Sequence, residues 1–203
     1  MNYITDILYW ISTGLLVPVI VLLILLFCRA LLLVGTFFGQ YVAVRKTEAL
    51  LKGEFDALSQ DNLATLADRL PKSDKSLVVR YIRLMMLHRD SEAHLQKLLS
   101  DFDLAAAADL ATSKTLAKMG PMLGLMGTLI PMGPALVGLS TGDIASMAYN
   151  MQVAFATTVV GLFSAAIGFI TGQVKTRWYR HDSVNLQFLA DLLANDKCSM
   201  VNG

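Results

Sequence analysis

Three long stretches without a charged side chain constrain the fold of this chain more than any other feature. They cover residues Ile7–Cys28, Met119–Gly142 and Ile144–Val174. About 20 apolar residues in a helix cross a hydrocarbon layer of about 30 Å. Backbone groups in lipid must be satisfied within the protein, and none of the three stretches alternates as a barrel strand does. We therefore predict an all-α integral membrane protein with three transmembrane helices.

The composition agrees with this fold class. The chain has 203 residues, of which 55% are hydrophobic and 16% charged, which is too apolar for a soluble domain of this size. The leading sequence MNYITD has an acid and no base, so we expect a retained helix and not a cleaved signal peptide. A net charge of +1 gives no case for nucleic-acid binding. Cys28 and Cys198 lie far apart and predict neither a disulfide nor a metal site, and no cofactor is expected.

Basic residues flank the three stretches on one side only. They are Arg29, Arg45, Lys46, Lys52, Lys114, Lys118, Lys175, Arg177 and Arg180, whereas the other side carries only Asp6 and Asp143. The positive-inside rule then places the N-terminus outside and the C-terminus in the cytoplasm. We expect a multi-pass protein of the cytoplasmic (inner) membrane. We interpret Arg29 as ending the first span, with its guanidinium reaching the inner headgroups. The alternative is a functional arginine buried in the membrane, and the sequence leaves its role open.

Long cytoplasmic helical extensions are also predicted. Apolar residues recur at helical spacing in residues 76–88, 91–118 and 177–193, and Pro71–Asp74 is a predicted turn. No proline or glycine separates Ser91 from Gly120, so one helix should rise from the cytoplasm into the second span. The predicted organisation is a first transmembrane helix with an inner-boundary extension (1–43), a cytoplasmic helical region (44–118), transmembrane helices two and three (119–173) and a cytoplasmic helix and tail (174–203).

Small residues recur every three or four positions in the second and third spans. Because this spacing puts them on one helix face, each face invites close approach by another helix. The predicted packing residues are Gly120, Gly124, Gly127, Pro131, Gly161 and Gly168.

Each of these two spans also carries threonine near mid-depth, namely Thr128 in one and Thr157 and Thr158 in the other. The ordinary interpretation is interhelical hydrogen bonding or bonding back to the helix's own carbonyls. The alternative is a polar lining for an ion path.

Two motifs resemble those of a known family. GPMLGLMGTLIPM, followed after a short loop by AFATTVVGLFSAAIG, is similar to the paired motifs of the MotA/TolQ/ExbB proton-channel family. The resemblance covers roughly residues 105–180, and three spans place the chain nearer the ExbB/TolQ branch than the flagellar stators. It implies a homo-oligomer, commonly a pentamer, in the lipid membrane around an ExbD/TolR/MotB-like dimer of single-span partners that carry a transmembrane aspartate.

The same resemblance implies that ions pass between the partner aspartate and the threonine faces. Thr128 matches the threonine that ends the first motif. Thr158 matches the second motif by its distance to Gly161, and Thr157 matches it by its preceding alanine, so both remain open. ExbB-type members carry a glutamate about two turns before that glycine, where this sequence has Gln152 and Val153.

The two threonine-bearing spans contain no group that stores a proton at neutral pH. Met119–Gly142 and Met151–Gly172 lack Asp, Glu, His, Lys and Arg. A hydroxyl relays or coordinates an ion but does not hold a proton of its own for transport. If the chain conducts protons, the carrier must therefore come from another chain. The alternative is a non-conducting scaffold that assembles through its small-residue faces.

Other polar residues predict less. His88, His94 and His181 lack metal-ligand spacing and are expected at the surface. Asp143 follows a Ser-Thr-Gly loop and is expected to cap the third span's helix. Paired polar groups that would suggest an intramembrane enzyme are missing from the spans.

Overall fold

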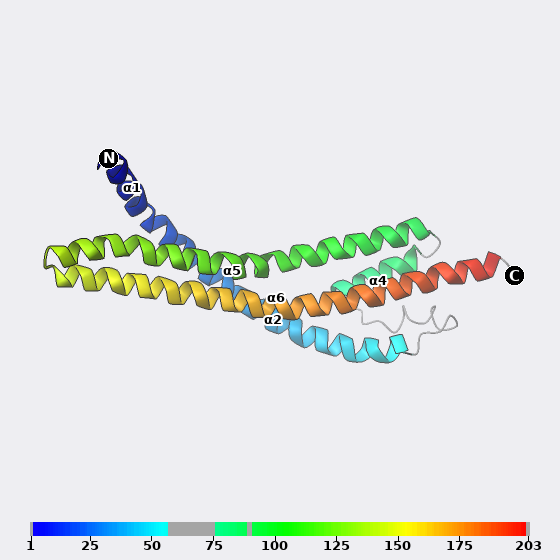
Figure 1. Ribbon diagram of the computed structural model, residues 1–203. Helices are drawn as coiled ribbons and strands as arrows, with labels where there is room; N and C mark the ends of the chain where they lie inside the picture. The colour runs from blue at the N-terminus through cyan, green and yellow to red at the C-terminus, as the bar shows by residue number, and fades with distance from the viewer. Residues whose placement is uncertain (1, 57–75, 89–90, 202–203) are drawn as a thin grey trace. The chain divides into compact units, whose positions relative to one another are not determined.

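The computed structural model describes residues 2–56, 76–88 and 91–201, and every element in these ranges is a helix (Figure 1). The helices are α1 (Asn2–Gly14), α2 (Leu16–Asp56), α4 (Leu77–Leu87), α5 (Glu92–Ser140) and α6 (Ile144–Val201). Among the described residues, three helical stretches are long and apolar enough to cross a membrane, in Trp10–Val42, Glu92–Ser140 and Ile144–Ala194. The predicted all-α fold with three spanning helices is confirmed.

The first apolar stretch is divided between two helices, which the sequence analysis did not predict. Helix α1 ends at Gly14 and α2 begins at Leu16, two residues before Pro18. Proline has no N–H to donate to the Gly14 carbonyl, and its ring is tolerated only in the first turn of a helix. The Leu15 N–H still donates to the Ile11 carbonyl at 3.1 Å, so the break is local.

Contacts along the chain define two compact units. The first consists of Met1–Gly35 with Ala111–Gly172, and the second of Thr36–Leu110 with Gln173–Gly203. Helices α2, α5 and α6 contribute residues to both units.

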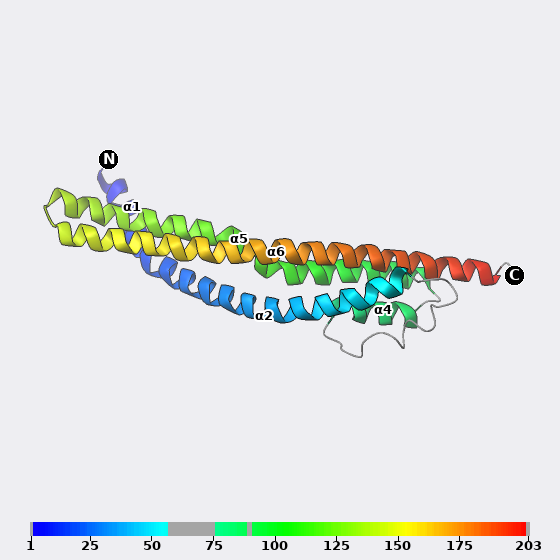
Figure 2. The ribbon, with the colours of Figure 1, turned by 90° about the horizontal axis from the view of Figure 1, so that it is seen from below.

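In the first unit, the parts of α5 and α6 lie side by side and antiparallel, as both views show (Figures 1 and 2). A tight turn joins them. The Asp143 N–H donates to the Gly138 carbonyl at 2.8 Å and the Gly142 N–H to the Leu139 carbonyl at 3.2 Å, the pattern of a Schellman motif. Gly142 has φ +78°, a conformation that favours glycine.

Asp143 then starts the next helix. Its Oδ1 accepts a hydrogen bond from the Ser146 N–H at 3.0 Å, so the predicted helix cap is confirmed. Two adjacent residues thus specify the connection, because Gly142 makes the turn and Asp143 caps the next helix. So short a connection makes α6 run antiparallel to α5.

Helix α2 packs on this pair through large side chains. Val19 and Leu23 are buried with Leu123 of α5, and Ala30 and Leu33 are buried with Leu116 further along α5. The rings of Phe27 and Phe163 of α6 lie 6.1 Å apart.

The second unit has a hydrophobic core of its own, built by α4, the first part of α5 and the last part of α6. Its buried residues are Val78, Val79, Ile82, Met85, Leu95, Phe102, Leu186, Leu189, Ala190 and Leu193. The helices predicted over 76–88, 91–118 and 177–193 are all present, and α5 continues without a break into the second apolar stretch. The predicted turn at Pro71–Asp74 lies outside the described residues.

A buried lysine links α5 to α6 within the second unit. Lys175 is 3% exposed, and its Nζ lies 2.8 Å from Oδ2 of Asp109. The Tyr179 hydroxyl donates to the same oxygen at 2.7 Å. Burial raises the pKa of the Tyr179 phenol, and the hydrogen bond to Asp109 raises it further, so the phenol remains a donor. The carboxylate therefore satisfies a buried ammonium and a half-buried phenol.

Replacing Asp109 by asparagine should destabilise the protein, because it leaves the Lys175 ammonium buried without a counter-charge. Removing one partner of a buried pair costs about 3 to 5 kcal/mol, and the partial exposure of Asp109 puts the expected loss at about 2 kcal/mol. Denaturant unfolding of the detergent-solubilised chain measures this loss. Asp103→Asn is the matched control, because Asp103 is exposed and bonds only Ser183 among the described residues. An equal loss in both variants would contradict the role of the pair.

Candidate functional site

The small residues of α5 and α6 lie against each other along the first unit and form what we call the glycine seam. Those buried on α5 are Gly120, Gly124, Gly127, Pro131, Ala135 and Gly138. Those buried on α6 are Ala154, Thr157, Gly161, Ser164, Ala165 and Gly168. The structure therefore brings together all six residues that the sequence analysis had selected for helix packing.

The two backbones are in direct contact at the seam. A Cβ atom added to Gly120 would lie 2.6 Å from the Gly161 carbonyl oxygen, and one added to Gly161 would lie 2.7 Å from the Gly120 carbonyl oxygen. One added to Gly168 would lie 2.7 Å from the Ala117 nitrogen. No side chain larger than hydrogen fits at these positions unless the helices move apart. Close backbone approach of this kind increases the dispersion contacts between the two helices. These contacts drive helix association in lipid, where the hydrophobic effect does not.

The hydroxyls of the three predicted threonines all bond to their own helix. Thr128 Oγ1 donates to the Leu125 carbonyl at 2.7 Å. The Thr157 and Thr158 hydroxyls both donate to the Ala154 carbonyl, at 2.9 and 3.1 Å. Each hydroxyl thus uses its one proton internally, and its oxygen keeps acceptor capacity for an external group.

Thr157 and Thr158 differ in their surroundings. Thr157 is 8% exposed, and a Cβ added to Gly127 would lie 2.6 Å from its side chain. Thr157 therefore fills the seam beside Gly127. Thr158 is half-buried, and its Cα lies near Gly124. Thr128 is also half-buried.

Thr128 and Thr158 lie on the side of the α5–α6 pair that faces away from α2. Successive helical residues are about 100° apart, so Thr128 is about 160° round α5 from Ile130, which packs in the cluster with α2. By the same arithmetic, Thr158 is about 180° round α6 from Ile167, which packs in the other cluster with α2. The two half-buried threonines thus share one face of the helix pair, which we call the threonine face.

The surroundings of the threonine face are apolar. Leu125, Met132, Phe155 and Leu162 are large exposed residues of the same spans. The spans therefore supply oxygen acceptors within an apolar surface, and their sequence contains no ionisable group from Met119 to Gly142 or from Met151 to Gly172.

Residues 78–186, more than half of the chain, match the MotA/TolQ/ExbB proton channel family. The chain belongs to this family. It is thus a multi-pass membrane protein of a proton-channel family and not of an enzyme family, and members of the MotA/TolQ/ExbB family typically pair with ExbD/TolR/MotB partners. No curated protein matched the chain. The matched region contains the whole glycine seam and the threonine face.

The three histidines that the sequence analysis considered belong to the second unit. His88, His94 and His181 are exposed, as predicted, and the rings of His88 and His94 stack 5.5 Å apart. Among the residues that the structure describes, no cluster of three metal-ligating side chains occurs. Sequence reasoning missed the Asp109–Lys175 pair, because Lys175 looked like one more basic residue flanking a span.

The glycine seam predicts opposite effects for two glycine-to-alanine substitutions. Gly161→Ala should lower the thermal unfolding midpoint, since the new methyl group meets backbone atoms of Gly120 and Gly124 below 3 Å. Gly35→Ala in α2 should increase the free energy of unfolding by about 0.5 to 1 kcal/mol and so raise the midpoint slightly, since no atom lies within 4 Å of the new methyl and alanine favours helix. Thermal unfolding in one detergent compares them, and a stabilised Gly161→Ala protein would contradict the close approach.

Proposed function

We propose that this chain is the channel subunit of an energy-transducing complex that couples ion flow, most simply of protons, to movement of a single-span partner dimer. The observation that carries the proposal is the threonine face, which offers Thr128 and Thr158 to a neighbouring helix. The partner's transmembrane aspartate supplies the proton-binding group that these spans lack. Several copies of the chain, five by resemblance, surround the partner in the inner membrane, as in the ExbB/TolQ branch.

The hydrogen bonds of the threonines suggest how the face distinguishes two states of the partner aspartate. A protonated carboxyl group is a donor, and the free lone pairs of Thr128 and Thr158 accept from it. An ionised carboxylate needs donors, but both hydroxyl protons are bonded to backbone carbonyls, and the spans hold no cation. Burying an unpaired carboxylate there is unfavourable.

This difference gives the coupling its direction. The threonine face favours the neutral partner, and loss of the proton drives the charged partner toward water or toward another subunit. A ligand shifts a conformational equilibrium only through its different affinities for the two states, and protonation supplies that difference here. Movement of the partner helices past successive subunits then follows proton binding and release.

The proposal predicts that the purified chain alone conducts protons poorly. Without a partner carboxyl group, no proton-storing group lies within the threonine-bearing spans. Liposomes loaded with a pH-sensitive dye should show a flux near that of empty liposomes, and the flux should rise when the chain is co-reconstituted with its single-span partner. Robust flux from the chain alone would contradict the need for a partner.

Replacing each of the three threonines by valine should have different effects on partner-dependent proton flux. Thr128→Val and Thr158→Val keep the shape but remove an acceptor, and loss of one hydrogen bond to a buried group should lower partner-dependent flux about tenfold. Thr157→Val should leave the flux per folded complex near wild type, because Thr157 is enclosed in the seam. Thr158→Ser restores an acceptor and is the matched control. Full partner-dependent flux through both the Thr128 and Thr158 valine variants would contradict the role of the threonine face. Absence of flux from the wild-type complex with its partner would favour the non-conducting scaffold.

A further inference from the structure

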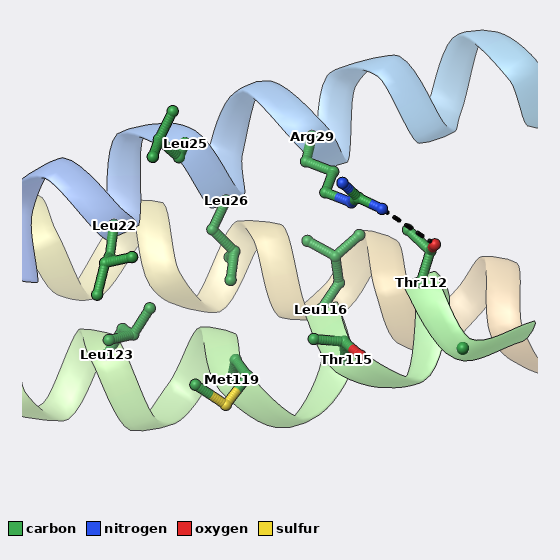
Figure 3. Close-up of a pocket in the computed structure, with 10 residues that line it drawn as sticks. Leu22, Leu25, Leu26, Arg29, Thr112, Thr115, Leu116, Met119 and Leu123 are labelled. Carbon is green, nitrogen blue, oxygen red and sulfur yellow. Dashed lines mark hydrogen bonds between the residues drawn. The ribbon is translucent and has the colours of Figure 1, made fainter.

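A groove lies between α2 and α5 in the first unit (Figure 3). Met119, which lines it, is nine residues and so about 180° round α5 from Thr128, which puts the groove on the side of α5 away from the threonine face. Its volume is about 470 Å³, within the range of about 300 to 1,000 Å³ that small-molecule sites occupy. Leu22, Leu25 and Leu26 of α2 form one wall, and Met119 and Leu123 of α5 form the other. Most of its surface is therefore hydrocarbon.

A single cation lies at one end of this groove. The Arg29 guanidinium points from α2 toward α5, where one nitrogen lies 3.5 Å from Thr112 Oγ1 (Figure 3). Among the described residues, Thr112 is the only hydrogen-bonding partner of the Arg29 guanidinium, and it is neutral. Arginine carries five donors and a full charge, so one long bond leaves most of its capacity for an anion.

The position of Arg29 in the sequence fits the boundary of a bilayer. Arg29 is the first charged residue after the apolar stretch Ile7–Cys28, and Leu22 lies seven residues, or about 10 Å of helix, deeper in that stretch. A ligand that satisfies both parts of the groove has an anionic head at Arg29 and a hydrocarbon tail along the leucines. Basic pockets between transmembrane helices on the cytoplasmic side bind anionic lipid headgroups in this way.

We propose that this groove binds one anionic phospholipid, with its phosphate on Arg29 and Thr112 and an acyl chain between α2 and α5. The lipid fills the space that the two helices leave and ties α2 to α5. This site is separate from the threonine face and does not depend on ion conduction.

A second copy of the chain fits the groove less well. Its apolar stretches Ile7–Cys28 and Ile144–Val174 contain no carboxylate that could pair with Arg29. Asp109, near the start of the second apolar stretch, is already paired with Lys175. A phospholipid supplies both the charge and the hydrocarbon.

Native mass spectrometry tests the proposal on the full chain. The chain is reconstituted into vesicles of equal parts phosphatidylglycerol and phosphatidylcholine, extracted in a mild detergent, and the retained lipid is counted. We expect about one phosphatidylglycerol per chain. Arg29→Gln should lower its retention about tenfold, because charge-assisted bonds to the phosphate are lost, and Arg29→Lys should restore part of it.

Two further variants separate the groove from general charge attraction. Lys118→Gln removes one positive charge from α5 outside the groove lining and should leave retention unchanged. Thr115→Phe places a ring into the groove from an exposed position and should lower retention with Arg29 intact. Both variants should unfold near the wild-type temperature in lipid-free detergent.

Four results would overturn the proposal. The first is unchanged phosphatidylglycerol retention in Arg29→Gln, and the second is an equal loss in Lys118→Gln. The third is a change of oligomeric mass in Arg29→Gln without a change in bound lipid, which would assign the groove to an interface between copies. The fourth is displacement of the lipid by millimolar glycerol phosphate, which would show that the headgroup alone is bound.

Discussion

The contact between the α5 and α6 backbones is the constraint on which the rest of the membrane-spanning unit depends. Gly120 and Gly161 approach so closely that each would clash with a methyl group on the other. Helices in lipid gain little from burying apolar side chains, so this contact area supplies much of the association. The same approach leaves no room for a side chain at the centre of the seam. A polar side chain of these helices must therefore lie either in a gap opposite a glycine or at the edge of the seam.

The threonines illustrate both outcomes. Thr157 occupies the gap opposite Gly127, whereas Thr158, one residue later and about 100° round the helix, lies at the edge with Thr128. All three hydroxyl protons are bonded within the helices, so the edge presents acceptors without donors. In the proposed function, the affinity of this surface for a neighbouring helix depends on whether the carboxyl group of that helix is protonated.

Much of this arrangement could be predicted from the sequence because it follows helical periodicity. The recurrence of small residues predicted the seam, and the Ser-Thr-Gly-Asp loop predicted the cap at Asp143. Periodicity did not separate Thr157 from Thr158, because both positions lie near the small face and only the placement of the partner helix decides between them. The break at Leu15 and the burial of Lys175 were also missed. The first depends on Pro18 within a continuous apolar stretch, and the second on a carboxylate 66 residues away.

Helix α2 associates with α5 and α6 through its side chains and not through close backbone contact. It contacts α5 and α6 through leucine, valine and phenylalanine side chains, and a Cβ added to its Gly35 would meet no atom within 4 Å. Large side chains hold the helix axes further apart than glycines do, and the space left beside Leu22 and Leu26 is the groove that ends at Arg29. A close-packed pair leaves no room for a lipid between its members, whereas helices held apart by large side chains leave a groove that a lipid can fill. Arg29, the first charged residue after the apolar stretch Ile7–Cys28, lies at the end of this groove, where the proposed lipid would place its phosphate.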